Sequence, residues 1–253
     1  NFFPEHLDYH DGLEKYWEAK KNILTRATGA DYFVYNPDYL GLKALAEETK
    51  AQTVPFVTTL PFSEDVIPLL GKHNVDNVRA AATAARIMGV SDAQIEKAVR
   101  AFKPLPHRLE KVGTYKDITF YDDAISTTPE STIAALEALP NVGTLFLGGK
   151  DRGYDFTALA QTIFEKNILN IVLFPESGAR ILEALEDSAK KNGTMLPKIF
   201  PTSDMKEAVT FAYANTPSGS VCLLSAASPS YSLWKNFEEK GTLFQTLVKE
   251  KMA

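Results

Sequence analysis

The chain has 253 residues, a formal net charge of −5 and a pI near 5.5. Its 45% hydrophobic and 23% charged residues are typical of a soluble globular protein with one large or two ordinary domains. The acidic balance argues against binding to nucleic acid, and no apolar run approaches the roughly 20 residues that cross a membrane. The one cysteine, Cys222, allows no disulfide within the chain, so we expect a cytoplasmic protein.

The first part of the chain predicts a βαβ-like unit after an initial helix. Residues 1–10, NFFPEHLDYH, lack an initiating Met and the features of a signal peptide, and we expect the chain to begin inside a longer protein. Apolar residues at helical spacing predict a helix over residues 12–27. Strands over residues 31–35 and 53–57 are expected to flank a helix at residues 41–50.

Two more helices are expected before the chain changes in composition. Residues 74–88 are rich in Ala and Arg, with Asn74 expected as the N-cap and Gly89 as the stop. The next helix is expected over residues 92–102, where a capping box begins at Ser91.

The segment KPLPHR at residues 103–108 places two prolines within three residues, which ends helices and stiffens the chain. We therefore expect two domains, over residues 1–104 and 105–253. Beyond this connector, short apolar strands alternate with amphipathic stretches. The strands are expected at residues 118–121, 144–147, 171–174, 198–200 and 221–224. This alternation predicts a doubly wound α/β fold with a parallel sheet, similar to a Rossmann fold.

Three polar segments follow predicted strands and should lie along one edge of this sheet, where such folds bind ligands. They are YDDAISTTPEST at residues 121–132, GGKDRG at 148–153 and SAASPSYS at 225–232. A helix is expected to start near Pro129, and capping by the hydroxyls before it would explain the first segment without any ligand. The alternative is an anion at the helix start and a carboxylate facing a metal-bound nucleotide.

The remaining candidate residues also have ordinary explanations. Lys150 and Arg152 could hold a carboxylate or phosphate, or could simply be solvated. His6 and His10 form too small a set for a zinc site. Asn74 and Asn77 could meet a nucleotide base or merely start a helix. The sequence contains neither GxGxxG nor the phosphate loop GxxxxGK[ST].

Six motifs, in order along the chain, resemble those of the Mur ligases, and most closely the glutamate-adding members. They are PEHLDYH at residues 4–10, GKHNVDN at 71–77, LPHRLE at 105–110, YDDAISTTPEST, LGGKDRGYDF at 147–156 and LLSAASPSYSLWKNFEEKG at 223–241. The resemblance implies that residues 1–104 form the later part of a central ATP-binding domain that begins after its phosphate loop. Residues 105–253 would form the C-terminal, Rossmann-like glutamate-binding domain.

The resemblance also implies a reaction. ATP, with Mg²⁺, would phosphorylate the carboxylate of UDP-N-acetylmuramoyl-L-alanine, and the amino group of glutamate would attack this acyl phosphate during peptidoglycan synthesis. Mg²⁺ and cationic side chains would stabilise the charge that develops on the phosphoryl group. We expect a monomer, and we expect this chain alone to be inactive because it lacks the phosphate loop.

Matching positions imply roles for particular residues. His6 and a carbamylated Lys20 would help to hold Mg²⁺, Asn74 and Asn77 would lie near adenine, and Arg108 and Asp123 would approach ATP. The residues that would bind glutamate are Thr127, Arg152, Ser230, Tyr231 and Phe237. The sequence departs from the family where DAISTT replaces DSKATN, which places Ile125 at the lysine position and leaves the choice between D- and L-glutamate open.

Three alternatives remain. A folylpolyglutamate-type ligase would share the lysine and the connector, but HRLE and KNFEEKG argue against it. A non-catalytic nucleotide-binding module would be consistent with Ile125. An NAD-dependent oxidoreductase would have a similar fold, but it would require the missing GxGxxG motif.

Overall fold

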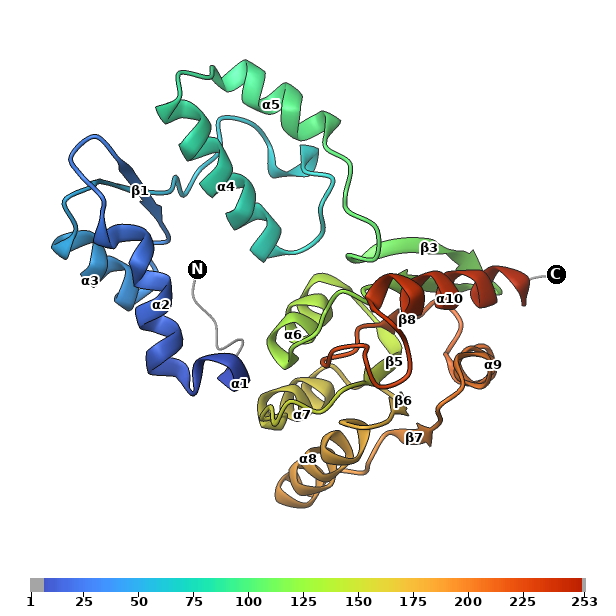
Figure 1. The fold of residues 1–253 in the computed structure, drawn as a ribbon. Helices are drawn as coiled ribbons and strands as arrows, with labels where there is room; N and C mark the ends of the chain where they lie inside the picture. Colours follow the sequence, from blue (N-terminus) through green and yellow to red (C-terminus); the bar gives the residue numbers. More distant parts are fainter. Residues whose placement is uncertain (1–6, 252–253) are drawn as a thin grey trace. The chain divides into compact units, whose positions relative to one another are not determined.

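The protein is described here by a computed structural model that covers residues 7–251 (Figure 1). It divides into two compact units, Asn1–Lys103 and Pro104–Ala253. The elements of the first unit are α1 (Leu7–His10), α2 (Leu13–Thr25), β1 (Tyr32–Tyr35), α3 (Leu40–Glu48), β2 (Gln52–Pro55), the 3₁₀ helix η1 (Glu64–Val66), α4 (Lys72–Ile87) and α5 (Asp92–Ala101).

The first unit contains the expected βαβ arrangement, because β1 and β2 pair in parallel on either side of α3. A small apolar core lies beside α4 and α5 and contains the buried residues Leu60, Ile67, Ala82 and Ile95. The capping box of Ser91 and Gln94 is present at the start of α5. Gly89, with φ of 83°, follows the end of α4 as expected for a helix stop.

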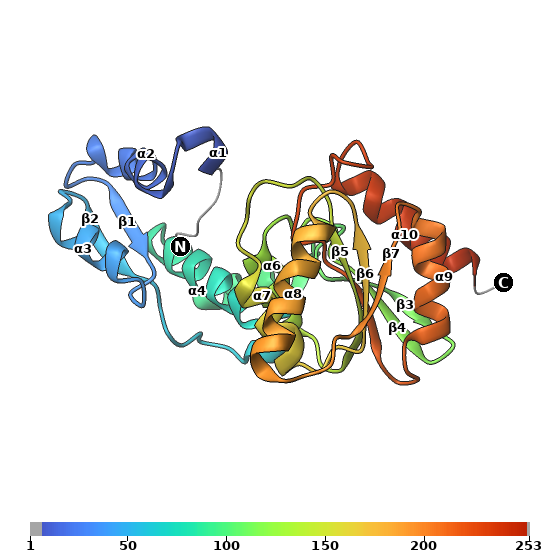
Figure 2. The same cartoon turned by 90° about the horizontal axis from the view of Figure 1, so that it is seen from below.

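The second unit alternates strands and helices around one six-stranded sheet (Figure 2). Its elements are β3 (Glu110–Tyr115), β4 (Ile118–Asp122), α6 (Pro129–Ala138), β5 (Val142–Gly148), α7 (Thr157–Glu165), β6 (Asn170–Phe174), α8 (Gly178–Asn192), β7 (Lys198–Pro201), α9 (Met205–Asn215), β8 (Val221–Leu224) and α10 (Phe237–Glu250). The strand order is β3-β4-β8-β5-β6-β7, and every neighbouring pair is parallel except β3 with β4.

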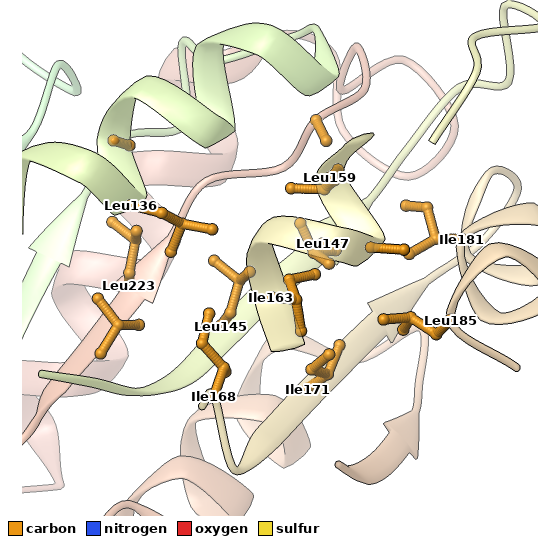
Figure 3. Close-up of a cluster of buried hydrophobic side chains, with 14 of the residues drawn as sticks. Leu136, Leu145, Leu147, Leu159, Ile163, Ile168, Ile171, Ile181, Leu185 and Leu223 are labelled. Atoms are coloured by element: carbon orange, nitrogen blue, oxygen red, sulfur yellow. The ribbon is translucent and has the colours of Figure 1, made fainter. Parts of the chain in front are cut away.

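Helices cover both faces of this sheet, which confirms the doubly wound fold. On one face, side chains of α6, α7 and α8 pack against Leu145, Leu147 and Ile171 (Figure 3). On the other face, α9 and α10 pack against Phe146 and Phe174. Successive residues of β5 therefore point to opposite cores, and the whole strand is buried.

The strand β3 was not expected from the sequence. It forms an antiparallel hairpin with β4 through Lys116 and Asp117, which both have positive φ (51° and 61°), as in a type I′ turn. Lysine and aspartate are not the strongest residues for such a turn, and Gly113 interrupts the apolar pattern of β3 at a bulge. The antiparallel edge strand therefore depends on pairing with β4 more than on its own sequence.

No helix within residues 7–251 is long and apolar enough to cross a membrane.

Candidate functional site

The three polar segments that follow β4, β5 and β8 meet at one edge of the sheet, as expected; we call it the carboxyl edge. The backbone N–H of Asp123 donates to the carbonyl of Leu224 (2.8 Å), and that of Gly148 donates to Ala226 (2.8 Å). The N–H of Lys150 donates to the carbonyl of Pro229 (2.7 Å). The parallel order β4-β8-β5 brings these strand ends together, because all three strands run in the same direction.

Asp123 lies inside this edge, with 3% of its surface exposed. Its Oδ1 accepts a hydrogen bond from the N–H of Leu109 (3.1 Å), and its Oδ2 accepts one from the hydroxyl of Ser225 (2.7 Å). Burial nevertheless raises the pKa of Asp123 to about 6, because these donors and Ser126 only partly offset the loss of water. The carboxyl group can therefore change charge near neutral pH.

The start of α6 is capped as the sequence predicted. The hydroxyl of Thr128 accepts a hydrogen bond from the N–H of Ser131 (3.3 Å), and Pro129 occupies the first helical turn. Thr127 precedes this cap and is half-buried, as is Ile125. The cap explains Thr128, but it leaves the side chain of Thr127 available at the carboxyl edge.

The loop after β5 packs its backbone closely at Gly149 and carries two cationic side chains, Lys150 and Arg152. A Cβ on Gly149 would lie 2.2 Å from the carbonyl oxygen of Pro229, so only glycine fits there. Lys150 pairs with Glu176 (3.0 Å). Arg152 is exposed and makes no ion pair within the part of the chain that is described, so its guanidinium could hold a carboxylate in two hydrogen bonds.

The segment after β8 places three predicted ligand-binding residues in different environments. Ser230 is 2% exposed, and its Oγ has no hydrogen-bond partner among the described residues. Tyr231 is 65% exposed. Phe237, at the start of α10, is half-buried, with its ring 6.2 Å from that of His107. A buried hydroxyl without a partner is unfavourable, and a bound polar ligand would satisfy it.

Arg108 lies on the same unit, just after the proline-rich connector. Its side chain is exposed, whereas its neighbours His107 and Leu109 are buried and have positive φ values of 60° and 44°. These two residues adopt a conformation that residues other than glycine rarely adopt.

In the first unit, Lys20 and Asn77 line one cavity of about 380 Å³ between α2, β1 and α4, together with Trp17, Tyr35 and Asp76. Lys20 is exposed, with Nζ 5.2 Å from the centre of the Tyr16 ring. The arrangement could receive an aromatic base beside polar groups. His6 lies outside the described residues.

The prediction that Asn74 is the N-cap of α4 is wrong. The helix begins at Lys72 after Gly71, whose φ of 94° allows the sharp entry. Asn74 is buried in the first turn, where its side-chain amide donates to the carbonyl of Leu70 (2.7 Å) and its Oδ1 accepts from Asn77 (3.3 Å). Asn74 thus orients Asn77 and does not itself line the cavity of Lys20.

A polar cluster beside the carboxyl edge, with three buried and two half-buried members, was missed from the sequence. It contains His107, Glu110, Asp122, Lys240 and Gln245. Asp122 is fully buried, with Oδ2 2.7 Å from Nδ1 of His107. Burial lowers the pKa of Lys240 to about 7, although Asp122 partly opposes this shift. Lys240 and Gln245 occur in an ordinary amphipathic helix pattern, so only their partners distinguish them.

His107, Glu110 and Asp122 are close enough to hold a metal ion, with ligand atoms within 4.8 Å of one another. The carboxylate oxygens already accept hydrogen bonds from the side-chain amide of Gln245, which donates to both Glu110 (3.0 Å) and Asp122 (2.9 Å), and Nδ1 of His107 faces Asp122. The two carboxylates are therefore satisfied by hydrogen bonds, whereas the buried Nζ of Lys240 has no hydrogen-bond partner among the described residues and lies 5.5 Å from the centre of the Trp234 ring.

The second unit is a doubly wound α/β domain with a polar carboxyl edge, and it follows a βαβ unit in the chain. Two family models match the chain: Mur ligase, glutamate ligase domain, over residues 107–228, and Mur ligase middle domain, over residues 1–66. The chain belongs to the Mur ligase family, as its motifs predicted.

The relatives within that family are glutamate-adding enzymes by name. The chain is 35% identical over 263 residues to UDP-N-acetylmuramoylalanine--D-glutamate ligase of Bacillus anthracis, a match that covers 96% of this chain and 57% of that protein. It is 34% identical over 270 residues to the ligase of the same name from Latilactobacillus sakei, covering 99% of this chain and 58% of that protein. The chain thus spans little more than half the length of these relatives.

Solved structures support the fold. MurF from Acinetobacter baumannii aligns with a TM-score of 0.72 at 18% identity, over 98% of this chain and 58% of that one. Folylpolyglutamate synthase from Mycobacterium tuberculosis aligns with a TM-score of 0.63 at 16% identity, over 92% of this chain and 60% of that one.

Proposed function

We propose that this chain is the catalytic and amino-acid-binding part of an ATP-dependent ligase that adds glutamate to UDP-N-acetylmuramoyl-L-alanine in peptidoglycan synthesis. The names of the relatives support the reaction. The observation that carries the assignment on this chain is the carboxyl edge, where Thr127, Arg152 and Ser230 come from three segments that meet through backbone hydrogen bonds.

Glutamate would bind at this edge of the second unit. The guanidinium of Arg152 would hold a carboxylate through paired hydrogen bonds, and the unpartnered hydroxyl of Ser230 would donate a further one. Thr127 would contact the ligand from the segment before α6, while Tyr231 and Phe237 would form its apolar border. Glutamate would thus supply hydrogen-bond partners to groups that have none among the described residues.

ATP is the proposed energy source, and each unit carries residues that are proposed to bind it. In the first unit, Lys20 and Asn77 line a common cavity with aromatic walls. In the second unit, Arg108 and Asp123 would contact the phosphates or their metal. Mg²⁺ prefers oxygen ligands, so Lys20 fits its site only as a carbamate, with His6 as the second proposed ligand. The bound ion would neutralise charge on the phosphoryl group.

The glutamate site can be tested with this chain alone, by following the binding of D- and L-glutamate with NMR titration. We expect Arg152→Ala to weaken binding at least about tenfold, because a charged hydrogen bond is lost. Lys150→Ala in the same loop is the matched control and should leave the affinity unchanged, since Lys150 pairs with Glu176. Equal affinities for the wild type and Arg152→Ala would contradict the assignment.

The reaction itself can be tested after joining the chain to the part of the Bacillus anthracis relative that it does not cover. Phosphate release should then depend on ATP, UDP-N-acetylmuramoyl-L-alanine and glutamate, whereas the chain alone should release none. Turnover with L-glutamate only would assign the opposite stereochemistry. Ile125 is the reason to test both forms, because an apolar side chain replaces the family's lysine at the carboxyl edge and leaves the choice between D- and L-glutamate open. Turnover with neither form would favour a non-catalytic nucleotide-binding module.

A further inference from the structure

The segment that carries Arg108 is held in an unfavourable backbone conformation. His107 and Leu109, on either side of Arg108, both have left-handed φ values, although neither is glycine. Such a residue is strained and persists only where the surrounding structure fixes it. The groups that fix His107 and Leu109 therefore determine where the exposed side chain of Arg108 points.

Leu109 is held at the carboxyl edge itself. Its N–H donates a hydrogen bond to Asp123 (3.1 Å), and its side chain is buried in the apolar core. His107 is fixed at three atoms. Its N–H donates to Oε2 of Glu110 (2.8 Å), its ring Nδ1 lies 2.7 Å from Oδ2 of Asp122, and its carbonyl accepts from the N–H of Ile125 (3.3 Å).

Two of these three partners are joined by one side chain of the last helix. The side-chain amide of Gln245, on α10, donates to Oε2 of Glu110 (3.0 Å) and to Oδ2 of Asp122 (2.9 Å). These are the same two oxygen atoms that hold the backbone and the ring of His107. Because a carboxylate can only accept, the orientation of the amide is fixed, with its NH₂ group between the two acceptors.

The backbone of α10 approaches the same pair closely. A Cβ at Gly241 would lie 2.2 Å from Nδ1 of His107 and 2.7 Å from Oδ2 of Asp122, so a side chain larger than glycine would displace the ring. Gln245 lies one turn further along this helix. The helix thus supplies both the space for the His107 ring and the donor that orients its two acceptors.

We propose that Gln245 is a positioning residue for Arg108: through Glu110 and Asp122 it keeps His107 in the left-handed conformation that directs Arg108 toward its ligand. The functional part of this proposal rests on the proposed role of Arg108 in ATP binding. The structural part does not, because it concerns only the contacts of His107 with α10.

The structural part can be tested by limited proteolysis of the whole chain. Trypsin binds its substrates in an extended conformation, and it does not cleave Lys103–Pro104, so Arg108–Leu109 reports on this segment. We expect Gln245→Leu to raise the rate of cleavage after Arg108 about tenfold, measured by mass spectrometry of the fragment that begins at Leu109. The matched control is Gln161→Leu. The side chain of Gln161 is exposed and forms its hydrogen bond within its own helix, so this substitution should leave the rate of cleavage after Arg108 unchanged.

A general loss of stability must be separated from this local effect. Gln245→Asn keeps the amide but shortens the side chain, so it should also raise the rate of cleavage after Arg108. The urea midpoint of the second unit in this variant should stay near that of Gln161→Leu. An unchanged cleavage rate in both Gln245 variants would overturn the proposal, and so would an increase at every Lys and Arg of the second unit alike.

The functional part needs the active, completed ligase described above. We expect Gln245→Leu to raise KM for ATP about tenfold and to leave KM for glutamate unchanged, in parallel with Arg108→Ala. Normal kinetics in Gln245→Leu, with impaired kinetics in Arg108→Ala, would overturn positioning by Gln245 and leave the proposed function intact. Normal kinetics in Arg108→Ala would instead refute the role of Arg108 itself.

Discussion

Asp123 shows how a single buried residue can make the stability of the second unit depend on pH. Its ordinary pKa of 3.8 rises to about 6 in the folded protein, mainly because of burial. The folded protein therefore holds this proton more tightly than the unfolded chain does. The associated stabilisation is fully present below about pH 4 and is lost as the pH rises through 6.

Asp123→Asn should remove this dependence, because an amide does not titrate and can still accept from Leu109. Between pH 4 and pH 7, the free energy of unfolding of the variant should rise relative to wild type by about 2 kcal/mol. Urea unfolding followed by the fluorescence of Trp234, at several pH values, would measure this difference. A difference that is independent of pH would contradict the raised pKa.

Asp151 provides the control of opposite sign. Its pKa is lowered, chiefly by the hydrogen bond from the N–H of Gly153 and also by Arg180, so it stabilises the fold above its ordinary pKa and loses this contribution as the pH falls. As the pH falls, the free energy of unfolding of Asp151→Asn should therefore rise relative to wild type. That of Asp123→Asn should fall relative to wild type over the same change.

The elements of the carboxyl edge meet so closely that the loop after β5 tolerates little change. Gly149→Ala would place its Cβ 2.2 Å from a backbone carbonyl of the segment after β8, which cannot move without breaking the hydrogen bond from Lys150. We expect the free energy of unfolding of the second unit to fall by at least about 3 kcal/mol, measured by urea denaturation.

Gly153→Ala, in the same loop, is the matched control for this prediction. Gly153 has a φ of 72° but no atom within 4 Å of the position of an added Cβ. Its substitution should cost only the backbone strain of about 1–2 kcal/mol. Equal costs at the two positions would show that the close approach of the β5 and β8 segments is not the reason for glycine at 149.

At the scale of the whole molecule, the two units differ in the size of their cores. The main core cluster of the described first unit contains only Leu60, Ile67, Ala82 and Ile95, whereas the sheet of the second unit buries side chains on both faces. Because burial of apolar surface is the main stabilising contribution, we expect the first unit to unfold at a lower urea concentration.

The chain carries a tryptophan in each unit, Trp17 and Trp234. In Trp234→Phe the remaining tryptophan fluorescence reports on the first unit, and in Trp17→Phe it reports on the second. Each substitution therefore lies outside the unit whose unfolding is measured. The urea midpoint should be lower in Trp234→Phe. Coincident midpoints would indicate that the two units unfold as one cooperative structure.

By itself, the sequence determined the family, the doubly wound fold and most of its strands and helix caps. These features depend on local patterns: apolar runs of strand length, Thr128 before Pro129, and motifs in a fixed order. The antiparallel strand β3 and the true start of α4 were missed, because pairing with β4 and the conformation of Gly71 outweighed local preference.

Only the tertiary structure decided which polar residues are available for ligands and which are held by the protein. Thr128 and Asp122 are occupied by internal hydrogen bonds, whereas Arg152 and the hydroxyl of Ser230 have no internal partners among the described residues. His107, Asp122 and Gln245 meet across 138 positions of the chain, from His107 to Gln245, and no local pattern records such a contact. The physical reason is that satisfaction of a buried polar group depends on partners that only folding brings within hydrogen-bond distance.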